Sequence, residues 1–210
     1  MSRRDDLREF AETWLGRPLQ PGEAASVPVS LRVPSALREI YEVFGSCVAL
    51  TSSHNRLLSP EAITQRDGFS IFYEENQGVC KWAFSAEEEL SDDPIVYRCD
   101  STTDGWVWRS EQLPVSEWIR PMTLWQLVNM GYAHGAYGSC IDGAIAKVSG
   151  VYPEVANLDT ARFFGADRQL VCVAGYRGIS DVWAGASDHE RYTRMLNQLN
   201  FDWDYDSDND

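Results

Sequence analysis

The residues that could carry catalysis lie in the glycine-rich stretch from 131 to 143. A hydrolase needs a nucleophile beside a base that a third group holds in place, and this stretch contains His134, Ser139, Cys140 and Asp142. No Gly-x-Ser-x-Gly elbow surrounds the serine, and triad members meet through folding rather than closeness in sequence. A hydrolase that uses His134 and Cys140 is therefore an alternative, and we expect a structural loop here.

The residues that could bind a metal ion follow no recognised ligand pattern. His54, His134 and His189 are far apart, and none belongs to a His-x-x-x-His or His-Glu-x-x-His pair. The alternating aspartates from 202 onward resemble the start of a calcium loop, but Ser207 stands where such loops have glycine. No glycine-rich phosphate loop follows a predicted strand. We therefore expect no metal ion, no other cofactor and no enzymatic activity.

Charge disfavours one class of partner and favours another. The 210 residues include 32 acidic and 18 basic side chains, which gives a formal net charge of −14 and a pI near 4.6. Such a surface repels nucleic acid and attracts a basic protein. Ten acids form two runs, Glu87, Glu88, Glu89, Asp92 and Asp93 in the first and the aspartates from 202 to 210 in the second. Both runs could also be solvated surface, the second as a disordered tail.

Composition predicts a soluble, cytoplasmic protein with an ordinary core. The chain is 44% hydrophobic, yet no apolar run approaches the roughly 20 residues that span a bilayer. Its first residues lead into an amphipathic pattern rather than a signal peptide. The five cysteines are odd in number and form no Cys-x-x-Cys pair, which favours reduced thiols. We expect no contact with a membrane.

The segment from 69 to 84 predicts a β-hairpin. Two apolar runs flank a polar turn with glycine, Glu74 to Gly78. On the second strand Cys80, Trp82 and Phe84 share one face, so this face should be buried while Lys81 points to the other. The tip, Glu74, Glu75, Asn76 and Gln77, is left exposed for a partner. A catalytic carboxylate pair at Glu74 and Glu75 is disfavoured, because neighbouring carboxylates on a turn need not converge.

The remaining pattern predicts an α+β fold. Helical spacing marks segments after Ser2, from 35 to 44, from 123 to 130 and from 187 to 199, with capping boxes at Ser2, Thr123 and Ser187. Further strands are expected at 47–50, 95–98, 106–108, 170–176 and 182–186, with a turn at Asp104-Gly105. Helices and strands are grouped rather than regularly alternating, so the sheet should be mainly antiparallel.

Three segments in this order resemble the SUKH superfamily, a group of bacterial immunity proteins that also includes a fungal cell wall assembly regulator. The first is Val33–Tyr41, where Pro34 opens a helix and Gly45 follows it. The second is the hairpin from Phe72 to Val79 together with Trp82. The third is Asp92–Tyr97, which contains Pro94 and is followed by Trp106 and a helix from Leu113 onward. Together these segments cover residues 33–131.

The resemblance implies a central, mainly antiparallel sheet flanked by helices, with no catalytic apparatus. It implies a protein that binds and neutralises a polymorphic toxin, which in this superfamily is often a nuclease. The negative charge of the chain fits a basic toxin domain. A regulatory or scaffolding module of the same fold is the alternative. We expect one domain over 1–201, with two small domains as the alternative. It should contain a hairpin and helix at 170–199 and be followed by a disordered acidic tail at 202–210. The expected partner-binding residues are Glu74, Glu75, Asn76, Gln77, Glu87, Glu88, Glu89, Asp92 and Asp93.

Overall fold

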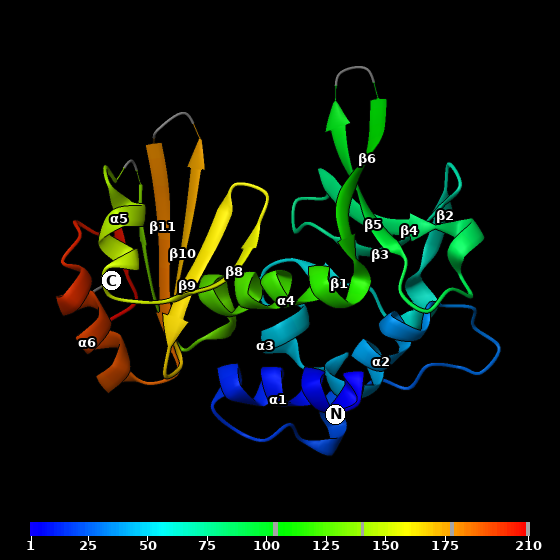
Figure 1. The fold of residues 1–210 in the computed structure, drawn as a ribbon, viewed down its shortest axis with the longest axis horizontal. Helices are drawn as coiled ribbons and strands as arrows, with labels where there is room; N and C mark the ends of the chain where they lie inside the picture. The colour runs from blue at the N-terminus through cyan, green and yellow to red at the C-terminus, as the bar shows by residue number, and fades with distance from the viewer. Residues whose placement is uncertain (103–104, 140, 177–178, 209–210) are drawn as a thin grey trace. The chain divides into compact units, whose positions relative to one another are not determined.

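The chain divides into two compact units. The structure, a computed structural model, describes residues 1–102, 105–139, 141–176 and 179–208. The first unit comprises residues 1–12 and 18–120, and the second comprises residues 13–17 and 121–210. Each unit has its own six-stranded antiparallel sheet (Figure 1). The α+β class is confirmed. One domain over 1–201 with a central sheet was expected, whereas the strands form two sheets, because periodicity alone does not show which strands pair.

Three helices precede the strands of the first unit. In α1 (Arg3–Leu15), the predicted capping box forms, since Ser2 Oγ accepts from the Asp5 backbone N–H at 3.2 Å and Ser2 N donates to Asp5 Oδ2. Helix α2 (Ser35–Phe44) follows Pro34 and ends at Gly45, as predicted. The strand expected at 47–50 is wrong. This segment is the short helix α3 (Val48–Thr51), because a short apolar run does not distinguish a strand from a helical turn.

The first sheet has the order β1-β3-β4-β5-β6, and β2 pairs with β3. The predicted hairpin is β3–β4, and the other predicted strands of this region are longer than their apolar runs. Asp104 lies outside the described residues. The strands are β1 (Arg56–Leu57), β2 (Thr64–Arg66), β3 (Phe69–Glu74), β4 (Cys80–Ser85), β5 (Ile95–Thr102) and β6 (Gly105–Pro114), with 3₁₀ turns η1 (Pro21–Glu23), η2 (Pro60–Ala62) and η3 (Ala86–Glu88).

The Trp82 face of the hairpin is core, as predicted. Cys80, Trp82 and Phe84 are all buried. The β3–β4 register skips from Ile71 to Tyr73, so Phe72 is an extra residue in β3. Such a bulge turns consecutive side chains toward one face, and the rings of Phe72, Tyr73 and Trp82 all lie within 5.7 Å of the Trp118 ring.

The opposite face of this sheet is only partly covered. Trp108 stacks on Phe69 with ring centroids 4.5 Å apart, over a small cluster of buried residues. Trp106 is half-buried, and the guanidinium of Arg66 lies 5.0 Å from its ring centroid. Lys81 also points to this side, with its Nζ 5.9 Å from the same ring. The predicted division into a covered and a wetter face is therefore present.

One long helix joins the sequence of the two units. Helix α4 (Val115–Gln126) crosses the boundary after Arg120 and continues as a π-helical turn, η4 (Leu127–Gly131). The prediction of a separate helix capped by Thr123 is wrong. Thr123 lies inside α4 and is fully buried. In the described residues no helix combines the length and apolar character needed to cross a bilayer.

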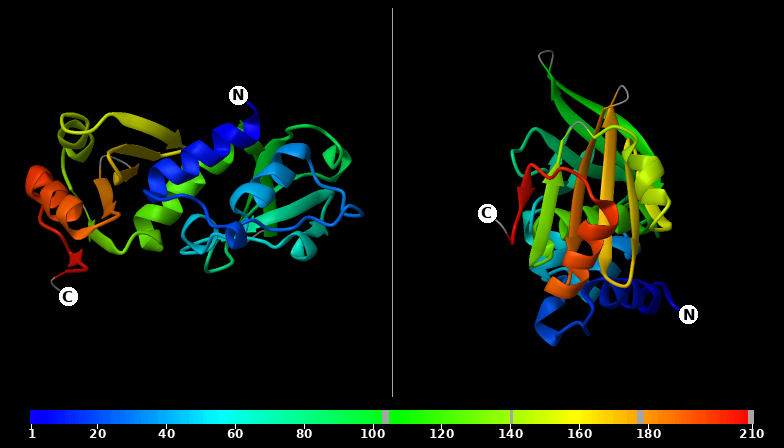
Figure 2. Two further views of the ribbon diagram at one scale, coloured as in Figure 1. Left: turned by 90° about the horizontal axis from the view of Figure 1, so that it is seen from below. Right: turned by 90° about the vertical axis from the view of Figure 1, so that its left-hand side faces the viewer.

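The second sheet has the order β12-β7-β11-β10-β9-β8. Strands β10 and β11 and the last helix were predicted, whereas β7, β8, β9, β12 and α5 were not. Helices α5 and α6 lie on the same face of this sheet (Figures 1 and 2) and share a core with it. The elements are β7 (His134–Gly138), α5 (Ala144–Ser149), β8 (Glu154–Leu158), β9 (Ala161–Ala166), β10 (Gln169–Tyr176), β11 (Ile179–Ala186), α6 (His189–Leu199) and β12 (Tyr205–Asp206).

The end of α4 covers the other face of the second sheet. The Trp125 ring lies 5.1 Å from that of Trp183 and 6.5 Å from that of Phe163. The last turn of α1 joins this face, because the Tyr132 hydroxyl donates to the Trp14 carbonyl at 2.8 Å. The second sheet is therefore flanked by helices on both faces.

Two expectations for the end of the chain differ from the structure. Asp188, rather than Ser187, caps α6, since its carboxylate accepts from the Arg191 backbone N–H at 3.0 Å. The expected disordered tail contains strand β12, which pairs with β7. The physical reason is that Phe201 and Trp203 pack against the core of the second unit, which holds the following residues beside the free edge of β7.

Candidate functional site

The predicted hairpin tip is mostly occupied by contacts within the chain. Glu74 accepts hydrogen bonds from Lys81 and Arg56, both at 2.7 Å. Partial burial acts to raise the pKa of Glu74, but these two cations outweigh it and the pKa is lowered. Glu75 accepts from the backbone N–H groups of Gln77 and Val79 and so stabilises the turn. Both carboxylates therefore have partners within the chain.

The amide residues of the tip are its exposed part. Asn76 and Gln77 are both exposed. The Asn76 backbone N–H donates to Asn55 Oδ1 at 3.3 Å, and its side chain lies 3.5 Å from His54 Nδ1. The exposed side chains of the predicted partner-binding tip are thus uncharged, and its two carboxylates form contacts within the chain.

The first acidic run divides into structural and exposed members. Glu89 accepts from Gln65 at 2.6 Å and from Ser70 at 3.2 Å. Asp92 forms an ion pair with Arg3 at 2.5 Å, and the hydrogen bond from Arg3 lowers the pKa of Asp92. Asp93 accepts from both the backbone N–H and the hydroxyl of Ser116.

Glu87 and Glu88 are the remaining members of this run. Both lie in the 3₁₀ turn η3, where Glu87 is exposed and Glu88 half-buried. Across the residues that the structure describes, no basic side chain forms an ion pair with either carboxylate. Of the five acids in the run, these two are therefore available to an external cation.

The residues that carry the SUKH resemblance have structural contacts in the first unit. Pro34 precedes α2, whose first N–H groups donate to the carbonyls of Ser91 and Asp92. A side chain at Gly45 would place its Cβ 2.6 Å from the Tyr41 backbone. Pro94 is buried and its carbonyl accepts from Val115. The segments 33–41 and 92–97 thus meet at the start of α2.

The second unit contains a cluster that the sequence did not predict. We define the histidine–aspartate cluster as His134, His189 and Asp208. His134 Nδ1 lies 2.8 Å from Asp208 Oδ1, and His189 Nδ1 lies 2.6 Å from Asp208 Oδ2. The hydrogen bond with His134, and then that with His189, lowers the pKa of Asp208. Two histidines that are 55 residues apart in the chain therefore share one carboxylate.

Strand register explains why these three residues meet. β12 runs antiparallel to β7 with Asp206 opposite Ala136, and the next bond joins Ser207 N to the Gly135 carbonyl, so Asp208 reaches the level of His134. On the other side, β11 pairs with β7 with Ala186 opposite His134. Helix α6 begins three residues later with His189. The alternating aspartates were the only local signal.

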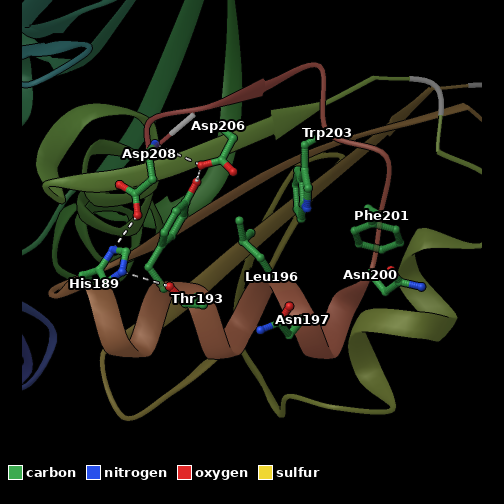
Figure 3. A pocket seen from close by; sticks show the side chains of 10 residues that line it. His189, Thr193, Leu196, Asn197, Asn200, Phe201, Trp203, Asp206 and Asp208 are labelled. Atoms are coloured by element: carbon green, nitrogen blue, oxygen red, sulfur yellow. Dashed lines mark hydrogen bonds and ion pairs between the residues drawn. The ribbon is translucent and has the colours of Figure 1, made fainter. Parts of the chain in front are cut away.

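A groove of about 480 Å³ opens beside the cluster, between α6 and the segment from 200 to 208 (Figure 3). His189, Asp206 and Asp208 line its polar end, and Phe201 and Trp203 line its apolar end. The Phe201 and Trp203 rings meet edge to face at 5.4 Å. The groove therefore combines charged and aromatic groups along one helix.

Tyr192 supports the cluster from inside the unit. Its ring stacks on that of His134 with centroids 5.6 Å apart. Its hydroxyl lies 2.6 Å from Asp206 Oδ1 and 2.9 Å from the Gly135 carbonyl. Burial, followed by the bond with Asp206, raises the pKa of Tyr192, so the phenol stays protonated and donates.

Among the described residues, no hydrogen bond joins the nucleophile and the base of the hydrolase alternative. Ser139 Oγ and the Ser139 backbone N–H both bond to Asp204 Oδ2 at 2.6 Å, whereas His134 bonds to Asp208. Asp142 is exposed, and Cys140 lies outside the described residues. The predicted nucleophile Ser139 and the predicted base His134 are thus held by different aspartates.

Comparison with known proteins gave no match, whether the chain was compared with family models, with curated proteins or with solved structures.

Proposed function

We propose that this chain is a non-enzymatic binding protein that associates one to one with a basic protein surface. Following the SUKH resemblance, the partner would be a toxin domain, and the role would be that of an immunity protein. The observation that carries the proposal is the pair of available carboxylates, Glu87 and Glu88, at the η3 edge of the first unit.

Charge supports association with a basic partner. The first unit contains 20 acidic and 11 basic residues, and the second contains 12 and 7, so both units contribute to the negative field. Such a field accelerates encounter with a positively charged surface and weakens as salt is added. The acids that pair within the chain contribute less to a partner, because their charge is already offset.

The contacts of the first unit support the SUKH part of the proposal. The segments 33–41 and 92–97 meet at the start of α2, and Trp82 of the hairpin lies in the core against Trp118. The residues that carry the resemblance thus belong to the scaffold, and the exposed η3 edge can differ from one partner to another without changing that scaffold.

The test is the association rate with a candidate basic toxin domain, sought first in the gene that neighbours this chain's own, measured by stopped-flow fluorescence at several salt concentrations. The double variant Glu87→Gln/Glu88→Gln should associate about 3-fold to 10-fold more slowly at low salt and depend less on salt. The matched control is Glu9→Gln/Glu61→Gln, which removes the same charge from exposed positions of the first unit. Glu89 stays unchanged because it holds Gln65 and Ser70.

The outcomes separate the proposal from its alternatives. A slower rate in the first variant alone, with protection ending at one equivalent of toxin, supports it. Equal effects in both variants, or none in either, would overturn the assignment to the η3 edge. Protection against a large excess of toxin by traces of this protein would indicate turnover and refute stoichiometric binding.

A further inference from the structure

We infer that the histidine–aspartate cluster is a binding site for a divalent transition-metal ion, and that its ligand set fits zinc best. Two imidazole nitrogens and one carboxylate oxygen converge there. Zinc binds these ligand types in proteins, whereas magnesium and calcium are bound by oxygen ligands. The site lies in the second unit and is independent of the acidic edge of the first.

The geometry is close to what one ion requires. The three ligand atoms, one from each residue, all lie within 4.8 Å of one another. Nitrogen and oxygen ligands bound tetrahedrally at about 2.1 Å are about 3.4 Å apart. His134 Nδ1 and His189 Nδ1 at present contact different oxygens of Asp208, at 2.8 and 2.6 Å, and each contact would widen by less than about 1 Å. The widest separation, at most 4.8 Å, would shorten by up to about 1.4 Å. Both changes are within the reach of side-chain rotation.

Proton positions are compatible with metal binding. A metal takes the place of the proton on each Nδ1, so the remaining proton sits on Nε2. His189 Nε2 lies 3.5 Å from Thr193 Oγ1 (Figure 3), and this hydroxyl can accept the Nε2–H bond. A partner of this kind orients a metal-binding imidazole.

The surrounding contacts hold the ligands from three separate elements. His134 is part of β7, between β11 and β12, and its ring is stacked on Tyr192. The Asp208 backbone N–H donates to Asp206 Oδ1 at 3.1 Å, which fixes the turn after β12. A bound ion would therefore tie the C-terminal segment to β7 and α6.

The groove gives the site an open coordination position. Three protein ligands leave one of the four tetrahedral positions for water or another donor. His189 and Asp208 both line the groove, so an external ligand reaches this position along α6. Phe201 and Trp203, at the other end, provide apolar surface for the rest of such a ligand.

The experiment is titration of the untagged full chain with Zn²⁺ by isothermal calorimetry, with Co²⁺ absorption as a report on tetrahedral geometry. We expect one Zn²⁺ per chain and a rise in melting temperature when Zn²⁺ is added. His189→Ala and Asp208→Asn should each weaken Zn²⁺ binding more than about 10-fold. The His189 side chain is 70% exposed, so its removal should leave the fold intact.

Matched variants decide the result. His54→Ala and Asp202→Asn change the same residue types outside the cluster and should bind Zn²⁺ as the unchanged chain does. Absence of Zn²⁺ binding in the unchanged chain would overturn the inference, as would binding that survives in both cluster variants. Equal loss in cluster and control variants, or equally tight Mg²⁺ binding, would also contradict it.

Discussion

Removal of the Trp82 side chain tests whether the aromatic core holds the first unit together. Trp82 is 7% exposed, and its ring lies 5.7 Å from that of Tyr73 and 5.6 Å from that of Trp118. A tryptophan of this kind buries about 200 Å², which at about 25 cal/mol per Å² amounts to about 5 kcal/mol. Alanine retains part of this burial, so Trp82→Ala should lower the free energy of unfolding by about 3–5 kcal/mol.

A second variant separates burial from hydrogen bonding. Trp82 Nε1 donates to Glu111 Oε1 at 2.9 Å. Trp82→Phe keeps most of the apolar contact but loses this bond to a carboxylate. It should therefore lower the free energy of unfolding by less than Trp82→Ala does, by about 1.5–3 kcal/mol. The control is Val79→Ala in the same hairpin, because Val79 is 52% exposed and should change stability by less than about 0.5 kcal/mol.

The assay is equilibrium urea denaturation followed by far-UV circular dichroism and fluorescence, since the two units can unfold in separate transitions. The variants should shift the transition of the first unit. A loss below about 1 kcal/mol for Trp82→Ala would refute the assignment of this ring to the core, as would a loss equal to that of Val79→Ala.

Two capping carboxylates give further predictions. Asp93→Ala removes the acceptor for Ser116 at the start of α4 and should cost about 0.5–2 kcal/mol in urea denaturation without changing partner association; a slower association rate would instead make Asp93 a binding residue. Asp188→Ala removes the cap of α6 and should cost about 1 kcal/mol at neutral pH. The pKa of Asp188 is lowered to about 2, chiefly by the Arg191 backbone N–H, so the folded state binds this proton less tightly than the unfolded state. The stabilisation is therefore complete above about pH 4 and lost as the pH falls toward 2, and a stability difference between the parent chain and the variant that stays constant over this range would contradict the assignment.

Local pattern was sufficient for the elements whose burial follows a single periodicity. The alternation of Cys80, Trp82 and Phe84 predicted a covered face, and Trp82 lies in the core. The proline at 34 and the glycine at 45 bound α2 as predicted. These features depend on neighbours two to four residues away, so the sequence contains their cause.

Short or interrupted patterns were not sufficient. Residues 47–50 are apolar enough for a strand but form the helical turn α3, and the predicted cap Thr123 lies inside α4 after Pro121. The strands β8 and β9 were missed because their burial is irregular along the chain. In each case tertiary packing overrode a weak local preference.

The acidic runs could be located from the sequence, but their availability to a partner depends on the tertiary structure. The sequence alone determined that the protein is strongly acidic and where its acids are concentrated. Tertiary structure decided which carboxylates are available, because Arg3, Lys81 and Ser116 reach Asp92, Glu74 and Asp93 from distant or opposing segments. A charge that is paired in this way no longer acts as a free surface group.

The histidine–aspartate cluster was decided by tertiary structure alone. His134 and Asp208 are 74 residues apart, and the pairing of β12 with β7 brings them to the same level of one sheet. That pairing depends on Phe201 and Trp203 packing against the core of the second unit, an interaction between segments with no periodic relation in sequence. Side-chain spacing determines which face of an element is buried, whereas strand register determines which distant side chains meet, and register is set by the burial of the whole sheet.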